Sequence, residues 1–519
     1  MSEAFSPEER AALSVYFSSV DGPVSALVNL PEVTKAALFA RHSRSAKPLR
    51  RLFLDEFLPD GAAPGPTMVG ATRAEELYQR VFLEYGDDSV AQLAGAHLVC
   101  EGVSNLLTKA LEWSRLMVYL EPSTRFVFYD ERTGGGWRYH VPTELPPSLR
   151  DRYVAVLDRT FESYTAWLPR MREFYARQFH RPEGVPDHVH GQTLRTKAID
   201  VLRGLLPAAT LSTVGIYGTG QGYEQLLLRL RAHPLAEARH CATLMLTELR
   251  KVVPALLERV DRPDRGGAWF AYLAETREAT RAVAARLLGG AGAEPRRDVT
   301  LTDFDPEGEV KVVAAALYSA TEFPDDQLLG LVRRMSHADR LAVLQAYVGR
   351  RRDRRHRPGL AFERSVYRFD VLAELGAFRD FQRHRLLSLE WQRLSPRHGY
   401  AMPEAIVEAG EAGEWQRVMD ESAALHDAIA GAGLPDVASY AVAMAYRVRF
   451  YMDMNAREAM HVIELRSGPP GQPPYQHFAQ AMHRLIGEQA GHRAIAAAMN
   501  FADHTDTPRL MLRSISRPE

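Results

Sequence analysis

The chain has 519 residues, of which 46% are hydrophobic and 25% charged, proportions typical of a globular protein. Its 64 basic and 65 acidic side chains give a formal net charge of −1, so composition provides no general attraction to nucleic acid or membranes. The two cysteines are too few for a disulfide scaffold or a cysteine-based metal centre. Because no stretch reads as a signal peptide or a bilayer-spanning helix, we expect a cytoplasmic protein. A chain of this length is too long for one ordinary core, so we expect two or more domains.

Helical periodicity dominates the first half of the chain. A short β-branched and aromatic run at residues 117–119 predicts a strand. Small and apolar residues predict one or two buried helices over residues 90–109. The other segments with helical spacing are residues 7–16, 31–40, 49–57, 149–179, 196–206, 223–231 and 235–260.

A flexible run of small residues at 288–295 separates two halves, which predicts domains over residues 1–290 and 298–519. The basic run at residues 350–357 is typical of a solvated face or loop. Helical spacing in this half covers residues 325–335, 337–347, 414–429, 438–451, 455–466 and 475–499.

A cationic cluster stands at Arg383-His384-Arg385, followed by Ser388 and by the pair Ser395 and Arg397. The planar fork of arginine suits phosphate and carboxylate, and histidine titrates near neutral pH. The cluster therefore suits an anionic, planar ligand such as a nucleotide, while a solvated basic helix end is the alternative. The apolar residues 371–378 favour the ligand site, because they place the triplet at the end of a buried helix.

Two other patterns carry less weight. His180, His188 and His190 lack a nearby carboxylate pattern, so we expect no metal there. Residues 218–222 are rich in glycine but lack the strand-loop-helix setting of a dinucleotide fingerprint.

Short matches in the same order indicate an internal duplication. Residues 35–40 resemble residues 314–319. Trp113-Ser114-Arg115 lies in the first half where the cationic triplet lies in the second. Further on, Gln221-Gly222-Tyr223-Glu224 parallels Asn455-Ala456-Arg457-Glu458.

These motifs resemble those of the flavin-dependent thymidylate synthases. The triplet matches the start of the family's hallmark, and Ser395 and Arg397 match its end if two extra residues are allowed. In the first half, Glu121-Pro122-Ser123-Thr124-Arg125 resembles the closing Glu-x-Ser-x-Arg, and Arg203-Gly204-Leu205-Leu206-Pro207 resembles the Arg-x-x-Leu-Pro motif. The resemblance spans nearly the full length, as two copies.

The resemblance implies an α+β fold: two tandem copies of a helix-rich domain, each with a small, largely antiparallel sheet. It also implies transfer of a folate-borne one-carbon unit to dUMP, with FAD as cofactor and NADPH and methylenetetrahydrofolate as co-substrates. No catalytic residue is assigned, since the family reaction needs no protein nucleophile. The residues implied for FAD are Arg383, His384, Arg385, Ser388, Asn455, Arg457 and His461. Those implied for the nucleotide are Glu121, Ser123, Arg125, Arg203, Ser395, Arg397 and Arg466.

The two halves keep different motifs, which predicts one composite site that draws on both. A homodimer of such chains would imitate the family's tetramer. Two alternatives stay open: a flavin enzyme acting on another nucleotide, and a non-catalytic paralogue that only binds nucleotide or flavin.

Overall fold

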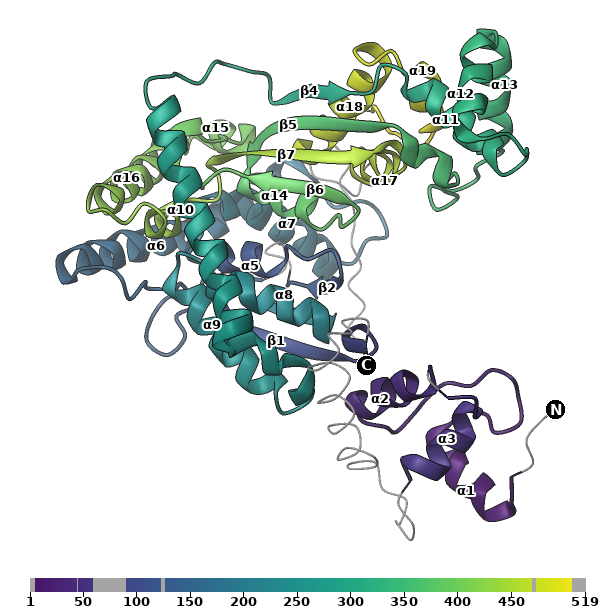
Figure 1. The fold of residues 1–519 in the computed structure, drawn as a ribbon. Helices are drawn as coiled ribbons and strands as arrows, with labels where there is room; N and C mark the ends of the chain where they lie inside the picture. The colour runs from purple at the N-terminus through teal and green to yellow at the C-terminus, as the bar shows by residue number, and fades with distance from the viewer. Residues whose placement is uncertain (1–4, 44, 59–89, 123–126, 469–472, 506–519) are drawn as a thin grey trace. The chain divides into compact units, whose positions relative to one another are not determined.

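The computed structural model describes residues 5–43, 45–58, 90–122, 127–468 and 473–505 (Figure 1). The chain forms two compact units, each assembled from several stretches of sequence. The first unit comprises Met1–Val103, Ala110–Glu121 and Ser212–Ala291. The second comprises Ser104–Lys109, Pro122–Leu211 and Gly292–Glu519, so it includes a long stretch from the first half of the sequence. Helices surround a small antiparallel sheet in both units, which confirms the α+β class.

The sheet of the first unit has the strand order β1-β3-β2. Its strands are β1 (Gly95–Ser104), β2 (Met117–Leu120) and β3 (Leu211–Thr219). β2 runs antiparallel to β3, with Met117 opposite Gly218. The remaining helices of this unit are α1 (Pro7–Tyr16), α2 (Glu32–His42), α3 (Leu49–Glu56), η2 (Val90–Gln92), α8 (Gly220–Arg231), α9 (Ala236–Leu249), η4 (Pro254–Asp261), η5 (Pro263–Gly267) and α10 (Ala268–Leu288).

The glycine-rich residues 218–222 join β3 directly to α8, with no loop between strand and helix, so the strand-loop-helix setting of a dinucleotide fingerprint is lacking, as expected. These glycines serve packing. A Cβ on Gly218 would lie 2.5 Å from Met117 Cε, and one on Gly220 would lie 2.7 Å from Leu256 Cδ1. Because side chains already fill the space beside the glycines, the segment leaves little room for a phosphate group.

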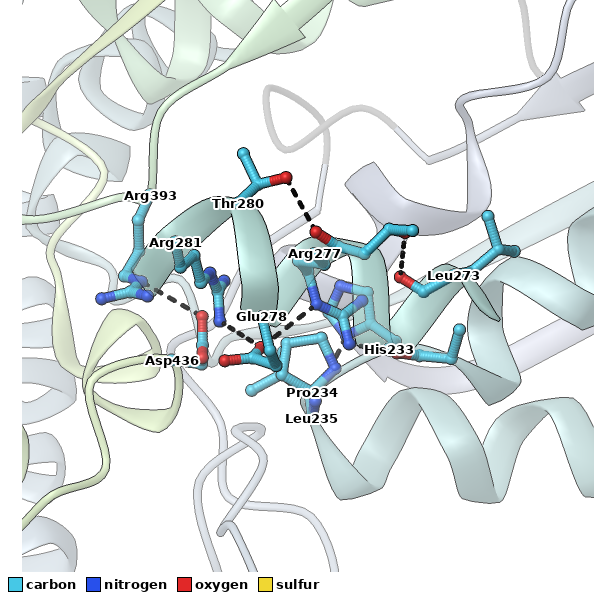
Figure 2. A network of polar contacts seen from close by, with 12 residues as sticks. His233, Pro234, Leu235, Leu273, Arg277, Glu278, Thr280, Arg281, Arg393 and Asp436 are labelled. Atoms are coloured by element: carbon cyan, nitrogen blue, oxygen red, sulfur yellow. Dashed lines mark hydrogen bonds and ion pairs between the residues drawn. The ribbon is translucent and has the colours of Figure 1, made fainter. Parts of the chain in front are cut away.

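Polar contacts, not a buried face, hold α10, which has no buried residue (Figure 2). The guanidinium of Arg277 donates to the carbonyl of Ala232, where α8 ends. Along α10 itself, Arg281 pairs with Glu278 at 3.1 Å. The same view includes an ion pair of the second unit, in which Arg393 Nε lies 3.1 Å from an Asp436 carboxylate oxygen.

The sheet of the second unit has the order β4-β5-β7-β6, with antiparallel neighbours throughout. Its strands are β4 (Val299–Phe304), β5 (Val366–Glu374), β6 (Leu387–Trp391) and β7 (Arg447–Asn455). Alternate residues of β5 and β7 are buried, as expected for a sheet with one face on the core. Helices of this unit that come from the first half of the sequence are α5 (Asn105–Leu111), α6 (Pro147–Gln178), α7 (Asp187–Leu202) and η3 (Arg203–Leu205). Those from the second half are α11 (Gly308–Tyr318), α12 (Asp325–Arg334), α13 (His337–Val348), η6 (Leu360–Arg364), α14 (Leu375–Gln382), η7 (Pro396–His398), α15 (Glu404–Glu408), α16 (Ala412–Gly431), η8 (Val437–Ala441), α17 (Ala456–Arg466), α18 (Pro473–Glu488) and α19 (Arg493–Ala498).

The two halves of the sequence are joined inside the second unit. The amide of Ala208 donates to the carbonyl of Val442 at 2.8 Å, and the amide of Met444 donates to the carbonyl of Leu206 at 2.9 Å. Nearby, α6 packs against α16, with the rings of Trp167 and Trp415 stacked at 6.5 Å. The Arg-x-x-Leu-Pro segment is therefore fixed against backbone from the other half of the sequence.

Four expected helices were wrong. Residues 235–260 form two elements, α9 and the 3-10 helix η4, with a break before Pro254. Residues 90–109 form η2, β1 and α5 instead of one or two buried helices. Residues 438–451 run through η8 into β7, where the buried residues alternate with a period of two. Residues 475–499 form two helices, α18 and α19, because the chain turns at Gly491 with φ 72°. Among the described helices, none is both long and apolar enough to cross a membrane.

Candidate functional site

The cationic triplet follows α14, whose residues are almost all buried, as expected from the sequence. His384 is buried with 7% of its surface exposed, whereas Arg383 and Arg385 on either side are exposed. Arg383 is the C-cap of α14, and its Nη1 lies 3.8 Å from the carboxylate of Asp380. The histidine is thus part of the core, and the two arginines present charge at the surface.

His384 is the centre of a buried polar network between α14 and α17. Arg466 donates from Nε to His384 Nε2 at 3.2 Å and from Nη2 to the Asp380 carbonyl at 2.7 Å. On its other side, His384 Nδ1 lies 3.5 Å from Glu458 Oε1. The ring of His461 lies 5.2 Å from the ring of His384.

The start of α17 explains why these side chains meet. Asn455 caps the helix by accepting the amide of Glu458 at 2.9 Å, so the helix begins directly after β7. Glu458, His461 and Arg466 then follow at helical spacing and lie along one side of α17. Arg457 points elsewhere and donates from Nε to the carbonyl of Pro358 at 2.9 Å.

Both histidines are neutral at pH 7. Burial lowers the pKa of His384, and burial also lowers the pKa of His461 to about 4. Arginine can only donate, so the Nε2 that faces Arg466 carries no proton, and Nδ1 of His384 donates toward Glu458. By the same rule His461 accepts from Arg357 through Nδ1, at 3.0 Å.

The geometry of this cluster also bears on metal binding. His384, Glu458 and His461 offer ligand-type atoms within 4.8 Å of one another, the one such group among the described residues. However, a metal would need a free lone pair on the histidine nitrogen that faces Glu458, and in His384 that nitrogen holds the proton. With Arg466 and Arg357 on the other ring nitrogens, the cluster suits an anion better than a cation.

A second feature of the same unit is a cavity of about 480 Å³ that contains Arg203. Its volume is in the usual range for small-molecule sites. Its lining comes from α6, α7 and η3 in the first half of the sequence. The second half contributes the end of β5, the start of α14, residues 401–405, α16 and residues 444–445 just before β7. The charged residues that line it are Lys197, Asp200, Arg203, Glu374 and Glu404.

Burial perturbs the charged groups of this cavity. It lowers the pKa of Lys197, whose Nζ lies 4.6 Å from the centroid of the Phe179 ring. It raises the pKa of Glu374, against the opposing charges of Arg203 and Arg447. Arg203 is itself buried, and Gly376 leaves space for it: a Cβ there would lie 3.0 Å from Arg203 Nη2. The cavity therefore holds a guanidinium in a low-dielectric place, where an anionic group binds strongly.

One helix connects the cavity to the cluster. Gly376 stands in the cavity wall near the start of α14, and Asp380 accepts from Arg466 in its last turn. The residues between Gly376 and Gln382 span about 9 Å at the rise of an α-helix. Cavity and cluster are thus neighbouring parts of one region.

The structure does not bring every expected residue to this region. Glu121 is buried in the first unit, where it accepts the hydroxyl of Ser212 at 3.0 Å. Ser123 and Arg125 lie outside the described residues. Ser388 is exposed on β6, opposite Asp453.

Two further placements concern the pair Ser395 and Arg397, which matches the family hallmark only with two extra residues, and Arg466. Ser395 precedes η7, and Arg397 is exposed there and does not line the cavity, although residues 401–405 just beyond it do. Arg466 lies with the residues expected at FAD, in contact with His384, and not in the Arg203 cavity.

Sequence reasoning missed several partners of the cluster. Glu458 had a readable signal, because an acidic residue three positions after an asparagine is a common helix start. Arg351 and Glu464 form an ion pair with only 1% of each side chain exposed, and no sequence pattern joins two residues so far apart. The basic run that contains Arg351 is therefore a solvated loop only in part.

The two sheets allow the copies to be aligned residue by residue. In the first unit Met117 pairs with Gly218, the residue before the N-cap Thr219 of α8. In the second unit Leu387 pairs with Met454, the residue before the N-cap Asn455 of α17. Both registers agree with the match between Trp113-Ser114-Arg115 and the cationic triplet. They also correct the other match, because Thr219 and not Gln221 corresponds to Asn455.

This alignment shows what the first copy has lost. Ser114 stands at the position of His384, and Gly222 stands at the position of Glu458. Gln225 and Leu230 likewise replace His461 and Arg466. The buried polar network therefore exists in one copy only.

Comparison with known proteins agrees with this two-copy architecture. A family model described as "Thymidylate synthase complementing protein" matches residues 36–255 and 300–490, one segment in each half. The chain is 34% identical to a UPF0159 protein of Chlamydia muridarum over 525 residues, which cover 99% of this chain and 98% of that protein. It is 28% identical to a UPF0159 protein of Thermoplasma acidophilum over 503 residues, covering 92% and 96% respectively.

The duplicated sheet-and-helix frame, with its cationic triplet in one copy, defines an α+β protein of two tandem domains. The chain belongs to the thymidylate synthase complementing family, that of the flavin-dependent thymidylate synthases.

Proposed function

We propose that the chain is a flavin-dependent enzyme of the thymidylate synthase type, with one flavin site per chain in the second copy. The observation that carries this proposal is the His384 network, since it is intact once and is replaced at each of its four positions in the other copy. A protein that kept only the fold would have no reason to bury a histidine and a glutamate, with a second histidine and an arginine half-buried beside them, in one copy.

The residues present suit FAD. The exposed arginines Arg383 and Arg385 give planar donors for a pyrophosphate. The half-buried Arg466 and the buried His384 fix the loop from which they extend. Arg457 and His461 lie on the adjoining helix α17. Bound flavin would supply the electron transfer, and these residues would hold and orient it.

The cavity that contains Arg203 suits a nucleotide monophosphate such as dUMP. Arg203 and Lys197 would neutralise the phosphate, and Glu374 on the cavity wall would hydrogen-bond a base or sugar. NADPH and methylenetetrahydrofolate complete the reaction as donors of hydride and of the one-carbon unit. We also propose a homodimer, because two copies in each of two chains reproduce the four domains of the family's tetramer.

Absorbance and turnover test this proposal in sequence. The purified chain should be yellow, or should take up added FAD, and NADPH should bleach the flavin band. Tritium release from carbon five of dUMP, in the presence of methylenetetrahydrofolate, then measures the methylation itself.

The outcomes separate the alternatives. A chain that binds no flavin is not an enzyme of this type, and the non-catalytic paralogue then holds. A chain that binds and reduces flavin without acting on dUMP is a flavin enzyme for another nucleotide, which competition by other nucleoside monophosphates would identify.

A further inference from the structure

The loop between α13 and η6 carries an unusual density of positive charge. Residues 350–357 contain six arginines, one histidine and one aspartate. Such runs are most often solvated without function. Three properties of this loop argue otherwise: its fixed backbone, its unbalanced charge and its position.

Arg351 fixes the backbone of the loop from inside. Its guanidinium forms two hydrogen bonds of 2.6 Å with Glu464, deep in the core. The same guanidinium donates to the His356 carbonyl at 2.6 Å and to the Arg354 carbonyl at 3.4 Å. Asp353 adds a tight turn by accepting the amide of Arg355 at 2.7 Å. The loop is therefore held in one shape, and its other arginines are presented from a rigid base.

Few acidic groups balance these other arginines. Arg355 lies 3.6 Å from Asp353, and 76% of its side chain is exposed. Arg350, Arg352 and Arg354 form no ion pair with any residue that the structure describes. Like charges held close together repel one another, so the loop carries an electrostatic cost that an anionic ligand would relieve.

The position of the loop is next to the proposed flavin site. Arg357 Nη2 lies 3.0 Å from Nδ1 of His461. The following residue, Pro358, accepts Arg457 Nε at 2.9 Å. Two of the residues expected at FAD thus contact the end of the basic loop directly.

We infer that the loop of residues 350–357 binds the anionic tail of a co-substrate while its reactive ring reaches the flavin. This inference rests on the proposed function. The ligand chemistry is a small molecule with several phosphate or carboxylate groups at one end, since planar guanidinium groups pair well with both. The phosphates of NADPH and the glutamate tail of a folate both have this chemistry.

The test removes charge from the loop without touching its anchor. The triple variant Arg352→Gln, Arg354→Gln, Arg355→Gln keeps Arg351 and Arg357. The matched control is Arg150→Gln, Arg172→Gln, Arg177→Gln, which removes three exposed arginines from α6 of the same unit. Titration calorimetry on the full-length chain then measures binding of NADPH, NADH, monoglutamyl and polyglutamyl folate, and tripolyphosphate.

We expect the loop variant to bind tripolyphosphate and one of the co-substrates about tenfold more weakly or worse, with FAD affinity and melting temperature unchanged. Loss of the preference for NADPH over NADH identifies the nucleotide phosphates as the tail. Loss of the preference for polyglutamyl over monoglutamyl folate identifies the folate.

Equal binding of all these ligands by the loop variant, the control and the unmodified chain overturns the inference. Loss of affinity for single-stranded RNA alone also overturns it, because the loop would then serve a macromolecule. If the chain takes up no flavin, the proposed function fails separately. Titrations with tripolyphosphate and folate on the flavin-free chain still decide whether the loop is an anion site.

Discussion

The two copies in this chain share a frame and differ in what the frame carries. In each, a central strand (β3 or β7) runs straight into a capped helix (α8 or α17) and pairs with the strand that follows the triplet position. Only the second copy places a buried histidine and glutamate beside the start of this helix, with a half-buried arginine at its end. In the first copy a tryptophan, Trp113, lies beneath Arg229 at 4.7 Å instead. The fold of the first copy forms without the polar network. Stability therefore does not explain why the second copy contains it.

The largest difference that we expect between the copies concerns buried ion pairs. Replacing Arg351 by Met leaves Glu464 charged in the core, which should lower the free energy of unfolding of the second unit by about 3–5 kcal/mol. The matched change in the first unit is Arg259→Met, which unpairs the more exposed Glu224 and should cost about 1–3 kcal/mol. Urea unfolding followed by near-ultraviolet circular dichroism measures both, and equal losses would contradict the comparison.

The second prediction concerns flavin affinity. Replacing His384 by Ala removes the acceptor of Arg466. We therefore expect the dissociation constant for FAD to rise roughly 10- to 150-fold. Replacing its counterpart Ser114 by Ala should leave the constant unchanged. Fluorescence titration of FAD gives both values. An effect at Ser114 as large as that at His384 would mean that flavin contacts both copies.

A smaller effect is expected in the cavity. Arg203→Lys keeps the charge and removes the planar fork, so dUMP should bind roughly fivefold to tenfold more weakly. Arg195→Lys changes an exposed arginine of α7, the helix that precedes Arg203. Arg195 stacks on Phe128 and does not line the cavity. Calorimetric titration of dUMP with both variants decides. If Arg195→Lys weakens dUMP equally, the nucleotide does not lie in this cavity.

The smallest expected effect is on pH dependence. The pKa of His461 is lowered from 6.5 to about 4, and burial is the largest cause. Between pH 6.5 and pH 4 the unfolded chain therefore binds a proton at this histidine that the folded chain does not bind. Acidification from pH 6.5 toward pH 4 should therefore lower the melting temperature, and His384 should add to the trend in the same direction. A His461→Gln variant should show a shallower decline than the unmodified chain. The matched control is Gln225→Ala, at the position of the first copy that corresponds to His461. It should leave the pH dependence of the melting temperature unchanged.

Much of the frame could be predicted from periodicity. The helices over residues 7–16, 149–179 and 414–429 were confirmed to within three residues at each end, because a long amphipathic stripe has few competing interpretations. β7 was missed although its apolar residues alternate at Val448, Phe450, Met452 and Met454. The helical interpretation of that stretch gave too much weight to alanine propensity and too little to the period of two.

The site was less accessible to sequence reasoning. The triplet and the helix that begins with Asn455-Ala456-Arg457 could be found because their residues are close together in the chain. The pairing of Arg351 with Glu464 and the meeting of Arg203 with Gly376 depend on tertiary contacts between distant segments. Burial decides what each of these arginines does, and a string of letters gives no direct measure of burial.

The backbone hydrogen bonds between residues 206–208 and 442–444 also have a consequence for folding during synthesis, because one partner is made long before the other. Leu206 leaves the ribosome about 240 residues before Met444, its partner. At about 5–20 residues per second, the segment waits roughly 10 to 50 s for the backbone segment with which it pairs. Until α16 has been synthesised, the face of α6 that packs against it has no permanent neighbour. A nascent chain halted before residue 440 should therefore recruit chaperones more strongly than one halted after the last helix.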